Sequence, residues 1–162
     1  MRDIEHYLSG KAFAGGGHRF GEVFDPNTGR VQARVRLGSA AEIAAAVEAA
    51  KAVQPEWAAT NPQRRARVMF EFKRLLEANM DELALMLASE HGKVIADAKG
   101  DIQRGLEVIE FACGAPHLLK GDYTGNAGSG IDVYSMRVPL GVVAGITPFN
   151  FPAMIPMWKF GP

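Results

Sequence analysis

The side chain of Asn150 is the first candidate for chemistry, because it is an amide set between two aromatic residues and two prolines, Pro148-Phe149-Asn150-Phe151-Pro152. In such a stiff setting its NH₂ group could donate a hydrogen bond to an oxyanion that develops in a transition state. A preorganised contact of that kind lowers a barrier by on the order of 3 kcal/mol. The same amide could instead cap a helix that Pro152 opens. Spacing alone favours the cap.

The element expected to position Asn150 is the apolar run over residues 140–146, Leu-Gly-Val-Val-Ala-Gly-Ile. This run lacks the alternation of a half-exposed strand and is typical of a strand covered on both faces in a parallel sheet. In α/β proteins ligands bind at the carboxyl ends of such strands. Residues 146–151 are therefore the predicted ligand-binding edge.

Other candidate groups are weaker. Cys113 is the only cysteine of the chain, which excludes an internal disulfide. A reactive thiolate needs a helix N-terminus or a nearby cation. Cys113 instead ends an apolar helical stripe, so we expect a core residue with a raised pKa. The four histidines lack the spacing of a zinc site or a catalytic triad, and no metal is expected. The glycines at 15–17 are a weak phosphate-loop candidate, and a flexible turn is favoured.

Hydrophobic periodicity and turn residues predict the helices and strands around these candidate residues. Residues 7–37 predict a β-rich segment with a two-stranded ribbon. Ser39 and Glu42 have capping-box spacing, and Asn61-Pro62 suits a helix start. We expect helices over about 39–57, 61–76, 81–90 and 94–113, and an exposed strand over 131–137. The expected buried positions on the last three helices are Val68, Met69, Phe72, Leu75, Leu76, Leu83, Met86, Leu87, Ile95, Ala98, Ile102, Leu106, Ile109 and Cys113.

Charge and hydropathy exclude several classes of partner. The 162 residues contain 18 Lys and Arg against 18 Asp and Glu, so no net field favours nucleic acid or an anionic membrane. The polar start of the chain does not resemble a secretory signal or a transit peptide. Apolar stretches stay below the roughly 18 residues of a membrane span. We therefore expect no nucleic-acid or membrane partner, and a cytoplasmic location.

Residues 136–152 carry a family resemblance. Pro139-Leu140-Gly141-Val142 followed by Pro148-Phe149-Asn150-Phe151-Pro152 resembles the first signature block of the NAD(P)-dependent aldehyde dehydrogenase superfamily. There, a Pro-x-Gly-Val strand leads into Pro-(Trp/Phe)-Asn-Phe-Pro, and here strand, turn and helix start match in order. Residues 149–158, Gly92-Lys93 and residues 104–116 narrow the resemblance to the CoA-acylating (methyl)malonate-semialdehyde dehydrogenase branch. The similarity extends from Tyr7 over nearly the whole chain.

This resemblance implies oxidation of a small aldehyde through a cysteine thiohemiacetal, hydride transfer to NAD, and thioester transfer to coenzyme A. Asn150 falls on the family's oxyanion-hole asparagine, which favours that role over the cap. The dinucleotide-lining stretch falls on Ile146, Thr147, Pro148 and Phe149, with Thr147 and Phe149 as the preferred cofactor contacts. The nucleophilic cysteine and the general-base glutamate are expected outside this chain.

Arg104 matches the arginine that, in this branch, is expected to hold the distal carboxylate of the substrate. A guanidinium binds a carboxylate bidentately and stays charged at any relevant pH. The alternative is a surface ion pair with Asp101 or Glu107 at helical spacing, which the residues alone would favour. Lys159 does not match the family's ribose-contacting lysine and is expected on a helix surface.

The implied fold class is α/β, as the N-terminal part of an aldehyde dehydrogenase-like fold. Residues 1–120 would form the β ribbon and helical part of the NAD-binding domain. Residues 121–138 would form an oligomerisation arm, and residues 139–162 the first strand of a doubly wound parallel sheet. Open strand edges need a partner, so Asp132, Tyr134 and Arg137 are expected at a subunit contact of a dimeric or homotetrameric parent.

Three functions remain in competition on the sequence. The first is CoA-acylating oxidation of malonate or methylmalonate semialdehyde, and the second is a hydrolytic NAD(P)-dependent aldehyde dehydrogenase. The third is a non-catalytic fragment that at most associates with itself or with full-length subunits. The apolar end at residues 157–162 indicates a truncation within a helix, so we expect no catalysis from this chain alone.

Overall fold

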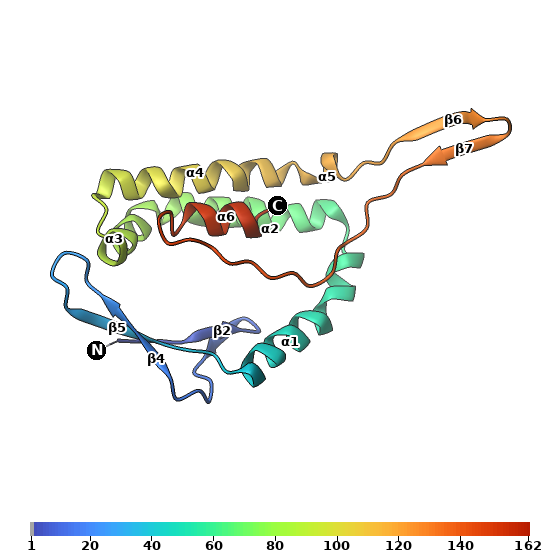
Figure 1. Ribbon diagram of the computed structural model, residues 1–162. Helices are drawn as coiled ribbons and strands as arrows, with labels where there is room; N and C mark the ends of the chain where they lie inside the picture. Colours follow the sequence, from blue (N-terminus) through green and yellow to red (C-terminus); the bar gives the residue numbers. More distant parts are fainter. Residues whose placement is uncertain (1) are drawn as a thin grey trace.

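A group of helices lies over a small N-terminal sheet in the computed structural model, which describes residues 2–162 (Figure 1). The sheet has the order β1-β5-β4, formed by β1 (Arg2–Ile4), β5 (Val31–Arg36) and β4 (Phe20–Phe24). β1 runs parallel to β5, and β4 runs antiparallel to it. β2 (His6–Leu8) and β3 (Lys11–Phe13) form a separate antiparallel ribbon. The predicted β-rich segment with a ribbon is confirmed.

The four predicted helices are present within a few residues of their expected ends. The first two helices begin at the predicted residues. Ser39 and Glu42 form a capping box at the first, and Asn61 accepts a hydrogen bond from the Gln63 amide at the second. Gly92 ends the third helix at φ +83°, a conformation that favours glycine. The helices are α1 (Ala40–Ala59), α2 (Pro62–Ala78), α3 (Met80–His91), α4 (Ile95–Cys113), α5 (Ala115–Leu118) and α6 (Met154–Phe160).

The glycines at 15–17 form a turn that is tied to the start of α1. The Glu42 carboxylate accepts hydrogen bonds from the amides of Ser39 and Gly16, each at 2.6 Å, and from the amide of Gly17 at 3.4 Å. These bonds, led by those with Ser39, lower the pKa of Glu42 to about 2. The turn is as predicted, but it is held rather than flexible. Amides that a phosphate loop would present to a ligand here bind a side chain of the protein itself.

The hydrophobic core lies where α4 meets α2, α3 and α6. The predicted buried stripe of α4 is confirmed except at Ile95, which is exposed. Ile102 and Ile109 are its most enclosed large side chains. The core cluster consists of Leu76, Ala84, Leu87, Ala98, Ile102, Leu106, Ile109 and Met157.

The burial predicted on α2 and α3 is confirmed only in part, at Leu76 and Leu87. On α2, Leu76 is buried and Met69 is half-buried, whereas Val68, Phe72 and Leu75 are exposed. On α3, Met86 is also exposed. The apolar stripe of each helix is wider than the face that α4 covers. Helical spacing identifies such a stripe but not the width of the element that packs against it.

The predicted parallel strand over residues 140–146 is not formed. The segment is extended but carries no strand pairing, and Leu140 and Ile146 are 95% and 90% exposed. A strand requires a hydrogen-bonded neighbour, and residues 2–162 place none beside it. The segment instead runs past α1 (Figure 1). Residues 141–144 line a hollow there together with Val47 and Lys51. Within the residues that the structure describes, the strand expected over 140–146 is therefore absent, and the doubly wound sheet that it would begin stays a prediction.

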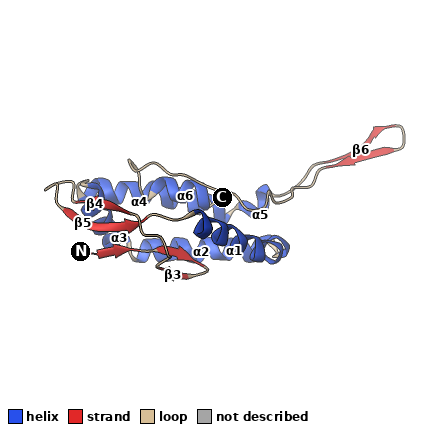
Figure 2. Cartoon of the chain, turned by 60° about the horizontal axis from the view of Figure 1, so that its bottom comes forward, coloured by secondary structure: helices blue, strands red, loops and turns tan. Residues whose placement is uncertain are grey.

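A hairpin projects away from the helices on the far side of α5 (Figures 1 and 2). It consists of β6 (Tyr123–Gly128) and β7 (Ile131–Tyr134), paired antiparallel. The Asp132 carboxylate accepts hydrogen bonds from the Asn126 amide and the Tyr123 hydroxyl, both at 2.8 Å, and these bonds lower its pKa. The predicted exposed strand is confirmed over 131–134, and part of the turn-rich stretch before it becomes its partner strand.

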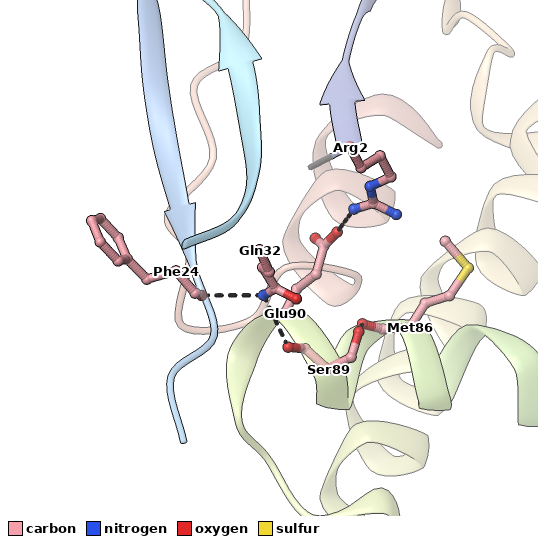
Figure 3. A network of polar contacts seen from close by, with 6 residues as sticks. All are labelled: Arg2, Phe24, Gln32, Met86, Ser89 and Glu90. Atoms are coloured by element: carbon pink, nitrogen blue, oxygen red, sulfur yellow. Dashed lines mark hydrogen bonds and ion pairs between the residues drawn. The ribbon is translucent and has the colours of Figure 1, made fainter. Parts of the chain in front are cut away.

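A small polar network fixes the sheet to the end of α3 (Figure 3). The Arg2 guanidinium pairs with the Glu90 carboxylate at 2.6 Å. The Gln32 side-chain amide donates to the carbonyl of Phe24 at 3.1 Å and to that of Ser89 at 3.3 Å. The last turn of α3, which leads into Gly92 and Lys93, is thereby held against β1 and β5.

Candidate active site

Two residues that the sequence singled out, Arg104 on α4 and Asn150 before α6, line the same open cleft of about 430 Å³. They come from segments far apart in the chain, and the packing of α6 on α4 brings them together (Figure 1). The remaining lining residues are Lys93, Ala96, Asp97, Gly100, Asp101 and Phe151.

Arg104 presents an exposed guanidinium to this cleft. Within residues 2–162 it forms no ion pair, so the predicted alternative of a pair with Asp101 or Glu107 is wrong. Only its backbone is engaged by α6, because the Trp158 indole donates to the Arg104 carbonyl at 3.2 Å. The charged end of Arg104 is therefore available to an anionic ligand.

Asn150 lies in a turn between the extended segment and α6, with its side chain exposed. Helix α6 begins at Met154, and the residue at its N-cap is Ala153, which makes no side-chain cap. The expectation of a helix opened by Pro152 and capped by Asn150 is therefore wrong. Asn150 therefore lines the cleft without serving as the cap of α6.

Asp101 is the residue that fixes this turn to α4. It is 2% exposed and is the one charged residue buried in the described part of the chain. Its Oδ1 accepts the amide hydrogen of Met154 at 2.7 Å, and its Oδ2 accepts from the Lys93 ammonium at 2.8 Å. On the sequence alone, Asp101 is expected only as a surface partner of Arg104. An aspartate at a core position of an apolar stripe, three residues after Ala98, was the signal that could have revealed it.

Gly105 allows α6 to approach α4 closely. A Cβ at this position would overlap the Met157 side chain and would lie 3.2 Å from the Met154 Cα. Glycine, which has no Cβ, therefore lets the first turn of α6 sit directly on α4. This contact sets the distance between the Asn150 turn and the face that carries Arg104.

The predicted cofactor stretch lies beside this cleft rather than within it. The Ile146 carbonyl accepts a hydrogen bond from Lys159 Nζ, and Thr147 is half-buried. The Phe149 ring packs on His91, with 5.4 Å between ring centroids. Together with Met86, Leu87 and other apolar side chains, Phe149 lines a pocket of about 180 Å³ against α3. Lys159 is exposed on α6, as predicted.

Residues 14–162 match the family model described as "Aldehyde dehydrogenase family". The chain belongs to the aldehyde dehydrogenase family.

Several relatives of this aldehyde dehydrogenase chain have more specific names. Malonate-semialdehyde dehydrogenase of Pseudomonas aeruginosa is 44% identical over 160 residues, which are 99% of this chain and 32% of the relative. The acylating mitochondrial methylmalonate-semialdehyde dehydrogenase of Arabidopsis thaliana is 50% identical over 141 residues, 87% of this chain and 23% of the relative. The chain thus spans about a third or less of the length of these relatives.

Solved structures agree with this assignment. A protein from Sinorhizobium meliloti 1021, assigned as a methylmalonate-semialdehyde dehydrogenase and complexed with NAD, superposes with a TM-score of 0.94 at 61% identity. The methylmalonate-semialdehyde dehydrogenase of Oceanimonas doudoroffii gives a TM-score of 0.93 at 47% identity. Each match covers 98% of this chain and 32% of the solved chain. The fold is that of the N-terminal part of an aldehyde dehydrogenase.

Cys113 is not placed to act as the nucleophile of this dehydrogenase family. Its side chain is buried at the end of α4, and burial raises the pKa of the thiol. The prediction of a core cysteine is confirmed.

Within residues 2–162, no three His, Cys, Asp or Glu side chains gather as metal ligands. No helix in that part of the chain combines the length and hydrophobicity needed to cross a membrane.

Proposed function

We propose that this chain is part of an NAD-dependent, CoA-acylating dehydrogenase. It would oxidise malonate or methylmalonate semialdehyde to acetyl-CoA or propionyl-CoA, respectively, with release of the substrate carboxylate as CO₂ and reduction of NAD to NADH. The observation that carries the proposal is the single cleft shared by Arg104 and Asn150. The names of the malonate- and methylmalonate-semialdehyde dehydrogenases that this chain matches support the same substrate class.

The two side chains suit the two ends of such a substrate. The Arg104 guanidinium has the planar donor geometry that binds a carboxylate bidentately. The Asn150 NH₂ can donate to the aldehyde oxygen as it gains negative charge. A short acid that carries an aldehyde would thus be held by its carboxylate while its carbonyl is polarised. An aldehyde without the carboxylate would lose the first contact only.

The segment Ile146, Thr147, Pro148 and Phe149 is the proposed NAD contact. Its residues form neither helix nor strand, and the exposed Ile146 and Phe149 side chains offer apolar surface to a ring system. When bound, NAD would accept the hydride of the substrate. The complex of the Sinorhizobium meliloti relative with NAD supports this cofactor. Coenzyme A is proposed as the acyl acceptor because the Arabidopsis thaliana relative is named as acylating.

Replacement of Arg104 by Leu in a complete enzyme that carries this segment tests the proposal. Charge-assisted hydrogen bonds contribute about 1.5–3 kcal/mol, so KM for malonate semialdehyde should rise roughly 10- to 100-fold. KM for propanal, which lacks the carboxylate, should stay within about twofold because it makes no such bonds. Equal effects on the two aldehydes would contradict the role of Arg104.

The acyl acceptor is tested separately in the unmodified complete enzyme. With malonate semialdehyde and NAD, acetyl-CoA should form only when coenzyme A is present. Release of a free acid at the same rate without coenzyme A would instead support a hydrolytic aldehyde dehydrogenase. These 162 residues alone should not oxidise aldehydes, because their one cysteine is buried.

A further inference from the structure

We propose that Lys93 and Asp101 form a buried ion pair that positions Asn150 for catalysis, acting through the first turn of α6. This inference rests on the proposed function, since it assigns two positioning residues to the same cleft. Lys93, Asp101 and Asn150 all line that cleft, but Asn150 alone would touch the reacting atoms.

The two oxygens of Asp101 join three separate segments. Oδ1 accepts from the Met154 amide at the start of α6, and Oδ2 accepts from Lys93 Nζ, which comes from the α3–α4 connection. Both bonds are short, at 2.7 and 2.8 Å. A carboxylate with both oxygens engaged has a fixed orientation, so the position of the Met154 amide relative to α4 is fixed as well.

Lys93 constrains the same turn from its other side. Its Nζ lies 4.3 Å from the centroid of the Phe151 ring, a distance suitable for a cation–π contact. Phe151 directly follows Asn150 in the chain. The turn is thus held at Met154 by Asp101 and at Phe151 by Lys93, with Asn150 next to the second of these contacts.

The position of Lys93 is restricted by the contacts of Gly92 and of the last turn of α3. It follows Gly92, which ends α3 in a left-handed conformation and packs so closely on Pro26 that a Cβ would lie 2.9 Å from the Pro26 Cγ. The preceding turn of α3 is bonded to the N-terminal sheet through Ser89 and Glu90 (Figure 3). These contacts restrict the positions that the Lys93 ammonium can occupy.

The energetics favour a positioning role over a purely stabilising one. A buried ion pair loses hydration, and an apolar pair of similar size often gives equal or greater stability. Most of the α4 stripe around Asp101 is apolar already. What an apolar pair could not supply is a directed hydrogen bond to the Met154 amide, which sets the angle of the turn that carries Asn150.

The test uses a complete enzyme that carries this segment, with Asp101→Asn and, separately, Lys93→Met. Misplacement of a catalytic group by about 1 Å can cost on the order of 100-fold in rate. We expect the first-turnover rate of NADH formation to fall roughly 10- to 100-fold. KM for the aldehyde and the Kd for NAD should stay within about twofold, because Arg104 and the NAD-binding segment are untouched. Lys93→Arg should restore most of the rate.

The deciding measurement repeats Asp101→Asn in an Asn150→Ala background. If Asp101 acts through Asn150, Asp101→Asn should lower the rate of the Asn150→Ala enzyme by less than about twofold. The same 10- to 100-fold loss in both backgrounds would overturn the positioning role while leaving the proposed function intact. An Asn150→Ala enzyme of normal rate would overturn the oxyanion role in the proposed function itself, and this inference with it.

A matched control and a second variant keep the test decisive. Glu107→Gln removes an exposed carboxylate from the same helix and should leave every rate unchanged. If the Asp101→Asn enzyme does not fold, Lys93→Met is compared with and without Asn150→Ala instead. The Lys93 side chain lines the cleft and is 13% exposed, whereas that of Asp101 is fully buried, so replacement of Lys93 should disturb folding less. A Lys93→Met enzyme of normal rate would contradict the proposal.

Discussion

Helices α1 and α4 have similar lengths and both carry apolar residues at helical spacing, yet only α4 is buried. None of the α1 side chains is buried, and Val53 is 62% exposed. In α4, eight residues are buried, and Ile109 is fully enclosed. The difference lies in their neighbours, since α4 packs against α2, α3 and α6 (Figure 1). Periodicity therefore predicts a helix, but not what covers it.

Local bonds, rather than burial, define the start of α1. Its capping box involves residues within one turn, and the same Glu42 carboxylate also binds the amides of the glycine turn. α4 has no side-chain cap at its start. One helix is thus specified mainly by short-range signals and the other mainly by tertiary packing, and each dependence leads to a separate prediction.

The largest expected effect is loss of core packing in α4. Ile109→Ala should lower the free energy of unfolding of the 162-residue chain by about 2–5 kcal/mol, because it removes a fully buried side chain and leaves a cavity. Val53→Ala, a truncation of an exposed side chain on α1, should cost less than about 1 kcal/mol because most of that side chain already contacts water. Urea denaturation followed by circular dichroism measures both, and equal losses would contradict the contrast.

An intermediate effect is expected from two glycines of α4. Gly105→Ala should destabilise the chain by about 1–3 kcal/mol, because the new methyl group overlaps Met157 and forces α6 away. Gly100→Ala is the matched control, since a Cβ there meets nothing within 4 Å. It should stabilise α4 by up to about 1 kcal/mol through helix propensity. Thermal unfolding of both variants gives the comparison, and stabilisation by Gly105→Ala would refute the close approach of α6.

The smallest expected effect is a pH dependence located in α1. The pKa of Glu42 falls from an ordinary 4.5 to about 2 on folding, chiefly because of its hydrogen bonds with Ser39. Its contribution to stability is therefore complete above pH 4.5 and is lost as the pH falls from about 4.5 towards 2. Tm measured at pH 5 and pH 3 should fall less for Glu42→Gln than for the unmodified chain. An equal fall in both would show that the carboxylate does not gain these bonds.

Much of the site was predictable as a set of residues, but its assembly was not. The motif around Asn150 and the placement of Arg104 on a helix follow from the sequence, whereas their common cleft depends on how α6 packs on α4. Asp101 was missed as an anchor because its partners are Lys93 and the Met154 amide, which only folding brings together.

The sequence by itself determined the four predicted helices, the caps at Ser39 and Asn61, and the family motif. These depend on contacts within about one turn or on the order of residues along the chain. The tertiary structure alone decided which stripes are buried and which charges are paired. The physical reason is that burial, ion pairing and strand pairing each require a second segment, whose position the local sequence does not specify.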